Sequence, residues 1–205
     1  MIRVSAVLVA VVVLAGCLFR TAEAPRFYRP ASAALDAEDS EHAPAPAASA
    51  PIRLHSVRSA PFLRERIVWR ASPVEYGLYE QRRWFELPSR YVRRALTNAL
   101  EATPGLHLDD DVKAARLDIE ILAFDEVLAP THQANVELAV TLREGTQERL
   151  DRVYEAQAPI TSADAADMAE AMGKALDDVV QKVAHAAASA LAPKPATPGR
   201  AHRAK

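Results

Sequence analysis

The sequence predicts an α+β fold, an α/β sandwich in which a mixed, largely antiparallel sheet has two main helices packed on one face. Three observations favour this class. Two long segments repeat apolar residues at helical spacing, several shorter segments alternate apolar and polar residues, and their order is strands, helix, three strands, helix. Half of the residues are apolar and a quarter are charged, so the chain can bury a core. The other sheet face is left to solvent or to a partner.

The region before the first helix contains three short candidate strands, at residues 52–57, 67–70 and 75–79. β-Branched and aromatic residues are frequent in them, as is typical of strands. Further upstream, Arg26–Tyr28 is a candidate edge strand. We therefore expect several strands to precede the first helix.

Two helices are indicated by their start signals and apolar stripes. The first begins at Pro88, which suits the first helical turn, and its pattern stops at Pro104-Gly105. The second begins at Thr161-Ser162, with Asp164 placed to support the first turn, and continues to about Leu191. The apolar stripe of the second helix consists of Met168, Met172, Ala175, Val179 and Val183.

Three strands occupy the interval between the helices. Residues 136–142 alternate in polarity, and the turn residues 144–147 then lead to a strand at 150–158, so these two strands form a hairpin. The preceding strand alternates over residues 117–121. Its phase blurs at residues 122–124, which indicates either a bulge or a strand covered on both faces.

The first 17 residues have the layout of a bacterial lipoprotein signal. Arg3 precedes a largely apolar stretch that is shorter than the roughly 20 residues needed to span a bilayer. Leu14-Ala15-Gly16-Cys17 then resembles a lipobox, in which cleavage between Gly16 and Cys17 leaves a lipid-modified cysteine at the new N-terminus. We predict a signal peptide over residues 1–16 and membrane anchoring through a lipid on Cys17; the alternative is an unmodified thiol.

The residue after the cysteine bears on localisation. Leu18, in place of aspartate, favours the outer membrane with the domain facing the periplasm, and inner-membrane anchoring is the alternative. Cys17 is the single cysteine of the chain, so no intramolecular disulfide can form. Stability must therefore come from a packed core.

Two segments of low complexity delimit one predicted domain, at residues 52–191. Residues 36–51 are rich in alanine, proline and acidic side chains, and with the lipidated N-terminus they make residues 17–51 a flexible segment. Such a spacer would let the domain move on the order of 20 Å relative to its anchor. Residues 192–205 form a basic, proline-containing tail that we expect to be disordered.

No pattern in the sequence indicates catalysis. The six histidines include no pair at i, i+3 or i, i+4, there is no Gly-x-Ser-x-Gly elbow, and the six glycines form no phosphate-binding loop. We therefore expect no enzyme, no metal site and no cofactor, and the net charge of −2 argues against a nucleic-acid partner. Asp109-Asp110-Asp111 could ligate a cation or form a solvated turn, and Asp125-Glu126 is an acidic pair without an identified partner.

Residues 72–96 combine five arginines with five aromatic residues. Tryptophan, tyrosine and arginine are the residues that contribute most often to interface energy, so Arg83, Trp84 and Arg90 are candidates for partner docking. The alternative is structural: Trp84 and Phe85 would anchor the corner between strand and helix while the arginines face solvent.

Four segments resemble one known family, the ABC-type transport auxiliary lipoproteins. They are "FYRPAS" after the lipid site, residues 65–102, the strand "ARLDIEILAFDEV" and the closing alanine-rich helix. The most specific part is Arg83, Trp84 and Pro88 at the entry to the first helix. The resemblance extends over nearly the whole mature chain.

The resemblance implies a non-enzymatic envelope lipoprotein that serves an ABC lipid transport system built around MCE proteins in Gram-negative bacteria. Its expected partners are an MCE-family protein and the associated ABC transporter subunits, and family members can form homo-oligomeric rings. The family has an α/β domain without known catalytic residues. The alternative function is a structural or assembly lipoprotein that binds peptidoglycan or an outer-membrane complex.

Overall fold

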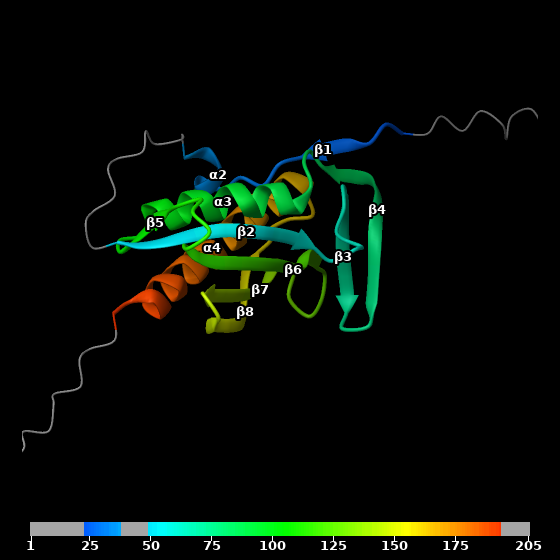
Figure 1. The fold of residues 1–205 in the computed structure, drawn as a ribbon. Coiled ribbons are helices and arrows are strands. Elements are labelled where there is room, and N and C mark those ends of the chain that lie inside the picture. The colour runs from blue at the N-terminus through cyan, green and yellow to red at the C-terminus, as the bar shows by residue number, and fades with distance from the viewer. Residues whose placement is uncertain (1–22, 38–48, 194–205) are drawn as a thin grey trace, which may run out of the picture.

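The computed structural model describes residues 23–37 and 49–193 (Figure 1). The predicted signal peptide, Cys17 and most of the basic tail therefore lie outside the described residues. The described chain forms one mixed eight-stranded sheet and three helices, which confirms the predicted α+β fold class. In chain order the elements are β1 (Arg26–Tyr28), α2 (Ala33–Asp36), β2 (Ala50–Ser59), β3 (Arg66–Ser72), β4 (Glu75–Trp84), α3 (Pro88–Ala102), β5 (Leu106–Leu108), β6 (Ala115–Val127), β7 (Gln133–Glu144), β8 (Gln147–Pro159) and α4 (Ala165–Leu191).

Strand β6 is the centre of the sheet. Along one edge it pairs antiparallel with β7, which continues through the predicted hairpin into β8. Along the other edge, the first part of β6 pairs in parallel with β2 and its last residues pair in parallel with β3. β3 continues antiparallel into β4, and the predicted edge strand β1 pairs with β4 in parallel. The β3–β4 hairpin thus extends the sheet at one end, where Figure 1 shows it crosswise to β2 and β6.

A bulge in β6 explains the blurred alternation at residues 122–124. The pairing with β7 changes register between Ile121 and Ala123, which confirms the predicted bulge. Beyond it Phe124 faces the core, and the next two residues, Asp125 and Glu126, point to opposite faces of the sheet because side chains alternate along a strand. The bulge therefore sets which face each of these carboxylates occupies.

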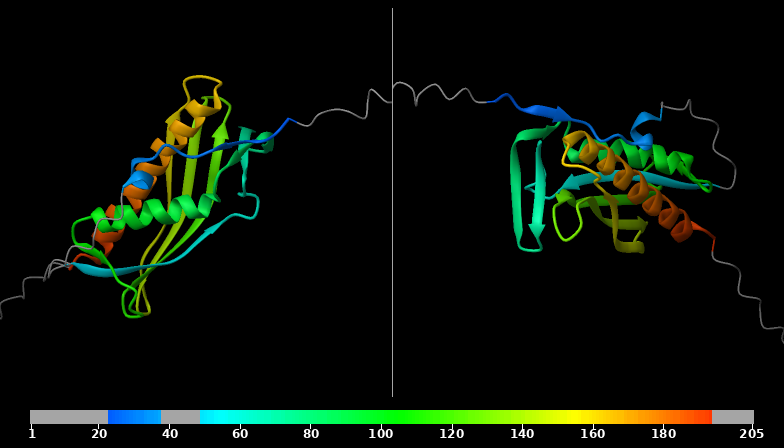
Figure 2. Two further views of the ribbon diagram at one scale, coloured as in Figure 1. Left: turned by 90° about the horizontal axis from the view of Figure 1, so that it is seen from above. Right: turned by 180° about the vertical axis from the view of Figure 1, so that it is seen from behind.

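Helices α3 and α4 cover the same face of the sheet, as predicted (Figure 2, left). α3 begins at Pro88, and α4 begins after its N-cap Asp164, whose carboxylate accepts a hydrogen bond from the Ala166 backbone N–H. The inward residues of β6 and β7 alternate with outward ones, so their apolar side chains pack beneath the two helices. The face turned away from α3 and α4 is called the outer face below.

The segment before the predicted domain is part of the fold. β1 completes the edge of β4, and α2 packs with Leu35 buried in the core. The predicted start of the domain at residue 52 is therefore too late. Residues 38–48 connect α2 to β2, two packed elements of the same domain. The prediction that residues 36–51 separate the domain from Cys17 is wrong, because β1 and α2 belong to the domain and precede this segment.

Two residues of α4 hold this N-terminal segment. The Asp177 carboxylate accepts hydrogen bonds from the Ser32 hydroxyl at 2.5 Å and from the backbone N–H groups of Ala33 and Ala34 at 2.9 and 3.0 Å. One turn earlier, Gly173 lies so close to the segment that an added Cβ would overlap the Ala31 carbonyl. The segment that leads to Cys17 is thus fixed to α4 by hydrogen bonds and by close backbone approach.

Replacing Gly173 with alanine is expected to destabilise the protein. Inside a helix this change ordinarily stabilises by up to about 1 kcal/mol. Here the new methyl group must displace the Ala31 backbone, and overpacking of this kind costs about 1–3 kcal/mol. Chemical denaturation should show a net loss of about 1–2 kcal/mol, and proteolysis at Arg29 should accelerate. Lys174→Ala, at the exposed neighbouring position, is the control; equal stability of the two variants would contradict the close packing.

Candidate docking surface

The β3–β4 hairpin has an apolar groove on the outer face of the sheet. The groove has a volume of about 470 Å³ and is lined by Phe62, Val68, Tyr76, Gly77 and Leu78. Phe62 and Tyr76 lie edge to face, with 6.5 Å between ring centroids. Phe62, Tyr76 and Leu78 are each about half exposed. The groove therefore exposes apolar surface to water, and a partner could cover it.

The groove follows from the strand pattern of the hairpin. Val68 and Leu78 are partners across the β3–β4 ladder and share the outer face, whereas Trp69 and its partner Gly77 share the opposite face. The Trp69 indole lies across Gly77, where a Cβ would overlap it. The inward side of the hairpin is filled by this ring, and the outward side remains open.

A buried ion pair on the outer face ties the hairpin to the main sheet. Arg70 of β3 places Nε 3.0 Å from Oδ2 of Asp125 on β6, whose side chain is only 2 % exposed. Asn135 donates a hydrogen bond to Oδ1 of Asp125 at 3.1 Å. Burial raises the pKa of Asp125, against the effect of Asn135 and Arg70. Burial, followed by the nearby Glu155 carboxylate, likewise raises the pKa of Glu137.

A second cluster ties the hairpin to β6 on the opposite face. Glu126 is buried, with Oε1 2.6 Å from Nε2 of His132 and Oε2 3.7 Å from a guanidinium nitrogen of Arg82 on β4. Arg82 also stacks over Tyr79 at 4.5 Å from the ring centroid. Burial, together with the Glu126 carboxylate, raises the pKa of Tyr79 to about 12. The Asp125-Glu126 pair therefore has partners on both faces, and both arginines come from the hairpin.

These partners could not be read from the sequence. Arg70 and Arg82 lie more than 40 residues before the two carboxylates, and the charges meet only because β3 pairs with the end of β6. The available signal was two consecutive acids in an otherwise apolar strand, since buried carboxylates require partners. The groove itself was missed because its residues come from β3, β4 and the preceding loop.

The structure corrects the docking prediction for Trp84. This side chain is 1 % exposed and packs edge to face on Phe124 and Tyr91, at 5.2 and 6.4 Å between ring centroids. A partner cannot contact it, so the anchoring alternative holds for Trp84. It does not hold for Phe85, which is 71 % exposed.

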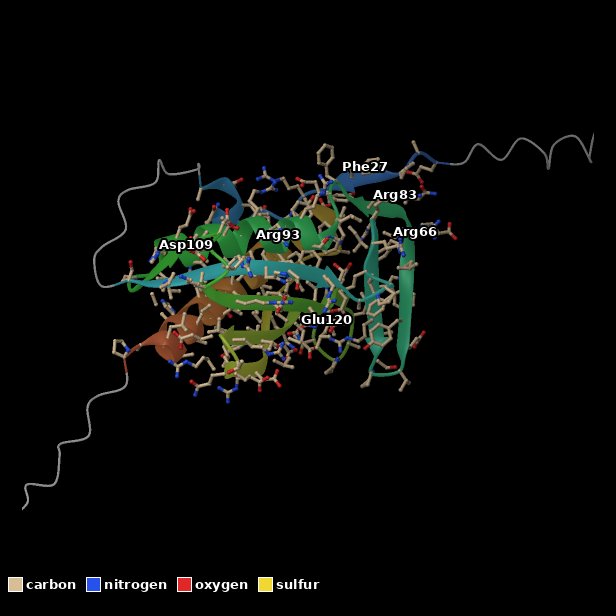
Figure 3. All side chains as sticks on the ribbon, viewed as in Figure 1. Phe27, Arg66, Arg83, Arg93, Asp109 and Glu120 are labelled. Atoms are coloured by element: carbon tan, nitrogen blue, oxygen red, sulfur yellow. The ribbon has the colours of Figure 1, made fainter. Side chains whose placement is uncertain are left out.

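The two predicted docking arginines lie near the surface. Arg90 is exposed on α3, and Arg83 lies on β4 in register with Phe27 of β1 and Arg66 of β3 (Figure 3). The Arg83 guanidinium is 3.9 Å from the exposed Glu65 carboxylate. Phe27, Arg66 and Arg83 lie at the β1 end of the hairpin, whereas the groove lies toward its turn.

The other sequence candidates have local roles. In the Asp109-Asp110-Asp111 run, the carboxylates of Asp109 and Asp111 accept hydrogen bonds from the backbone N–H groups of Asp111 and Lys113, at 2.8 and 2.9 Å. The run forms a turn that caps its own backbone. Among the described residues no group of three or more metal-binding side chains is brought together. Nor does any described helix have the length and hydropathy of a membrane span.

Two solved structures share this fold. Protein XCC0632 from Xanthomonas campestris matches with a TM-score of 0.64 and 19 % identity, covering 80 % of this chain and 96 % of that one. Hypothetical protein CT253 from Chlamydia trachomatis matches with a TM-score of 0.52 and 8 % identity, covering 71 % and 100 %. At these identities the likeness concerns the fold alone.

Sequence comparison identifies the family. None of the curated proteins compared with the chain matches it. Residues 34–184 match the family described as the ABC-type transport auxiliary lipoprotein component, a span that runs from α2 to α4. The chain therefore belongs to the ABC-type transport auxiliary lipoprotein family.

Proposed function

We propose that this protein is a non-enzymatic, membrane-anchored docking component of an MCE-type ABC lipid transport system in the Gram-negative cell envelope. Family membership supports the transport role and the lipoprotein character. The finer assignment follows the resemblance described above: a lipid on Cys17 anchors the chain in the outer membrane, and the domain faces the periplasm. There it binds an MCE-family protein, as a single copy or as a homo-oligomeric ring.

The observation that carries the docking role is the groove on the outer face of the hairpin. It presents aromatic and aliphatic side chains at the surface, with Arg70 5.8 Å from the Tyr76 ring centroid at its edge. Apolar anchors rimmed by polar groups are the usual composition of energetic interface centres. The two buried ion pairs hold the hairpin in place, so little conformational entropy is lost when a partner binds.

Membrane anchoring permits this docking contact to be weak. A tethered protein and a partner in the same envelope meet at a high effective concentration, so modest affinity suffices. The tether consists only of the residues between Cys17 and β1, because residues 36–51 come after β1 in the chain. The β1 end of the hairpin is therefore held close to the membrane that carries the lipid, and the groove lies toward the other end.

The docking role is tested by Leu78→Glu in the full-length lipoprotein. A charge in the groove should reduce co-purification of the MCE protein by about tenfold or more, because burying an unpaired carboxylate is unfavourable. Val112→Glu, at an 80 % exposed position beyond the far end of β6, is the matched control and should co-purify as the wild type does. Equal recovery of the MCE protein with both variants would exclude the groove as its docking site. Recovery of peptidoglycan instead of an MCE protein by the wild type would favour the structural alternative.

A further inference from the structure

The position of β1 limits how far the domain can lie from its lipid anchor. Glu23, the first described residue, follows Cys17 by six positions, and a fully extended chain spans at most about 3.6 Å per residue. The described segment then pairs with β4 and is held on α4 by Asp177. If Cys17 carries a lipid, Glu23 thus stays within roughly 20 Å of the bilayer, and the start of β1, three residues later, within roughly 30 Å.

The surface at this end combines exposed aromatic rings with arginines. Phe27 is 57 % exposed and Phe85 is 71 % exposed. The Phe85 backbone N–H donates to the Tyr28 carbonyl, which continues the β1–β4 pairing by one residue. Side chains alternate along a strand, so Phe85 lies on the same side as Arg83 and Phe27, opposite the buried Trp84. Arg66 is in register with Arg83, and Arg90 lies in the first turn of α3, five residues after Phe85 in the chain. We call Phe27, Arg66, Arg83, Phe85 and Arg90 the anchor-end surface.

The charge of the anchor-end surface is predominantly positive. Arg66 and Arg90 are exposed and have no ion-pair partner among residues 23–37 and 49–193. Glu86, next to Phe85, is paired with Arg94 at 3.1 Å. Two further carboxylates nearby are Glu65, 3.9 Å from Arg83, and Glu23, 3.7 Å from the neighbouring Arg26; both are exposed. Such exposed pairs at long distance are weak and can exchange for other anions.

We propose that the anchor-end surface lies against the headgroups of the bilayer that holds the lipid on Cys17, with anionic phospholipids as its ligands. Aromatic rings partition into the interfacial region of a bilayer, and arginines near the surface attract anionic headgroups. The short connection to Cys17 keeps this surface near that bilayer. The arrangement turns the hairpin end with Val74 away from β1, where the groove is free for a protein (Figure 1). This inference rests on the lipid anchor of the proposed function.

Lipid contact can be measured with a single thiol-reactive probe. Lipidation consumes the thiol of Cys17, the only cysteine, so Phe85→Cys introduces one free thiol for a fluorophore. The full-length acylated protein is reconstituted in vesicles of phosphatidylcholine with phosphatidylglycerol, and nitroxide-labelled lipids serve as quenchers. Val112→Cys, at a similarly exposed position beyond the opposite end of β6, is the matched control. Mass spectrometry confirms acylation in both.

The expected result is quenching at position 85 at least threefold stronger than at position 112. Adding Arg66→Glu and Arg90→Glu should reduce the quenching at position 85 while the protein stays acylated and membrane-bound. Equal quenching at both positions in acylated protein would overturn the inference and leave the proposed docking function intact. Shielding of position 85 that requires the MCE protein would identify a protein interface and would also overturn it. Absence of acylation would overturn the inference together with the proposed anchor.

Discussion

Trp84→Ala is expected to lower the free energy of unfolding by about 3–5 kcal/mol. The indole is fully buried between Phe124 of β6 and Tyr91 of α3, so its removal leaves a cavity between β4, β6 and α3. Phe85→Ala, one residue later, removes a ring that projects into solvent. Its effect should stay within about 0.5 kcal/mol, as is usual for surface substitutions.

Urea denaturation of both variants measures this contrast between neighbouring residues. The two side chains are similar in chemistry and adjacent in sequence, and they differ in the sheet face on which they lie. A loss of stability in Phe85→Ala comparable to that in Trp84→Ala would contradict the assignment of Trp84 to the core and Phe85 to the surface. Wild-type stability of Trp84→Ala would contradict it as well.

Arg70→Ala is expected to destabilise the protein by about 3 kcal/mol. The change leaves the Asp125 carboxylate buried without a counter-charge, with only Asn135 as a hydrogen-bond donor. Glu137 and Glu155 add further negative charge near Asp125, so the excess of negative charge becomes larger. Arg70→Ala combined with Asp125→Asn should recover most of the loss, since the amide carries no charge. If the double variant were as unstable as Arg70→Ala, the ion pair would not be the cause.

The loss in Arg70→Ala should depend on pH. Burial already raises the folded-state pKa of Asp125 above its ordinary value of 3.8, and removal of Arg70 raises the pKa further. Below pH 3.8 the carboxyl group is protonated in both folded and unfolded states, so the electrostatic deficit relative to wild type is small. The deficit relative to wild type grows as the pH rises above the folded-state pKa of Asp125 in the wild type, and it is complete above the higher folded-state pKa in the variant. Unfolding curves at pH 4 and pH 7 measure it, and a deficit independent of pH would contradict the account.

Local periodicity predicted the elements that carry strong patterns. α3, α4 and the β7–β8 hairpin have apolar residues at the spacing of their own secondary structure. α3 begins at Pro88 as predicted, whereas the N-cap of α4 is Asp164 and not the predicted Thr161-Ser162. The bulge in β6 could also be predicted from local sequence, because one extra residue changes the phase of the apolar–polar alternation. These features depend on residues close in sequence.

Long-range pairing determined the features that the sequence did not predict. Composition identified residues 36–51 as a spacer before the domain, but the docking of α2 on Asp177 shows that an element of the domain precedes this segment. The sequence does not show which face of the sheet an aromatic residue beside arginines occupies. It therefore could not distinguish the buried Trp84 from the exposed Phe85. The partners of Asp125 and Glu126 likewise required the pairing of β3 with β6.

The most direct test of the whole account is metabolic labelling of Cys17. Cells that express the full-length chain or Cys17→Ser are given clickable palmitate, and their membranes are fractionated. We expect label on the wild type alone, with the wild type in the outer-membrane fraction together with its MCE partner. An unlabelled, soluble wild type would contradict the anchor on which docking and orientation both depend.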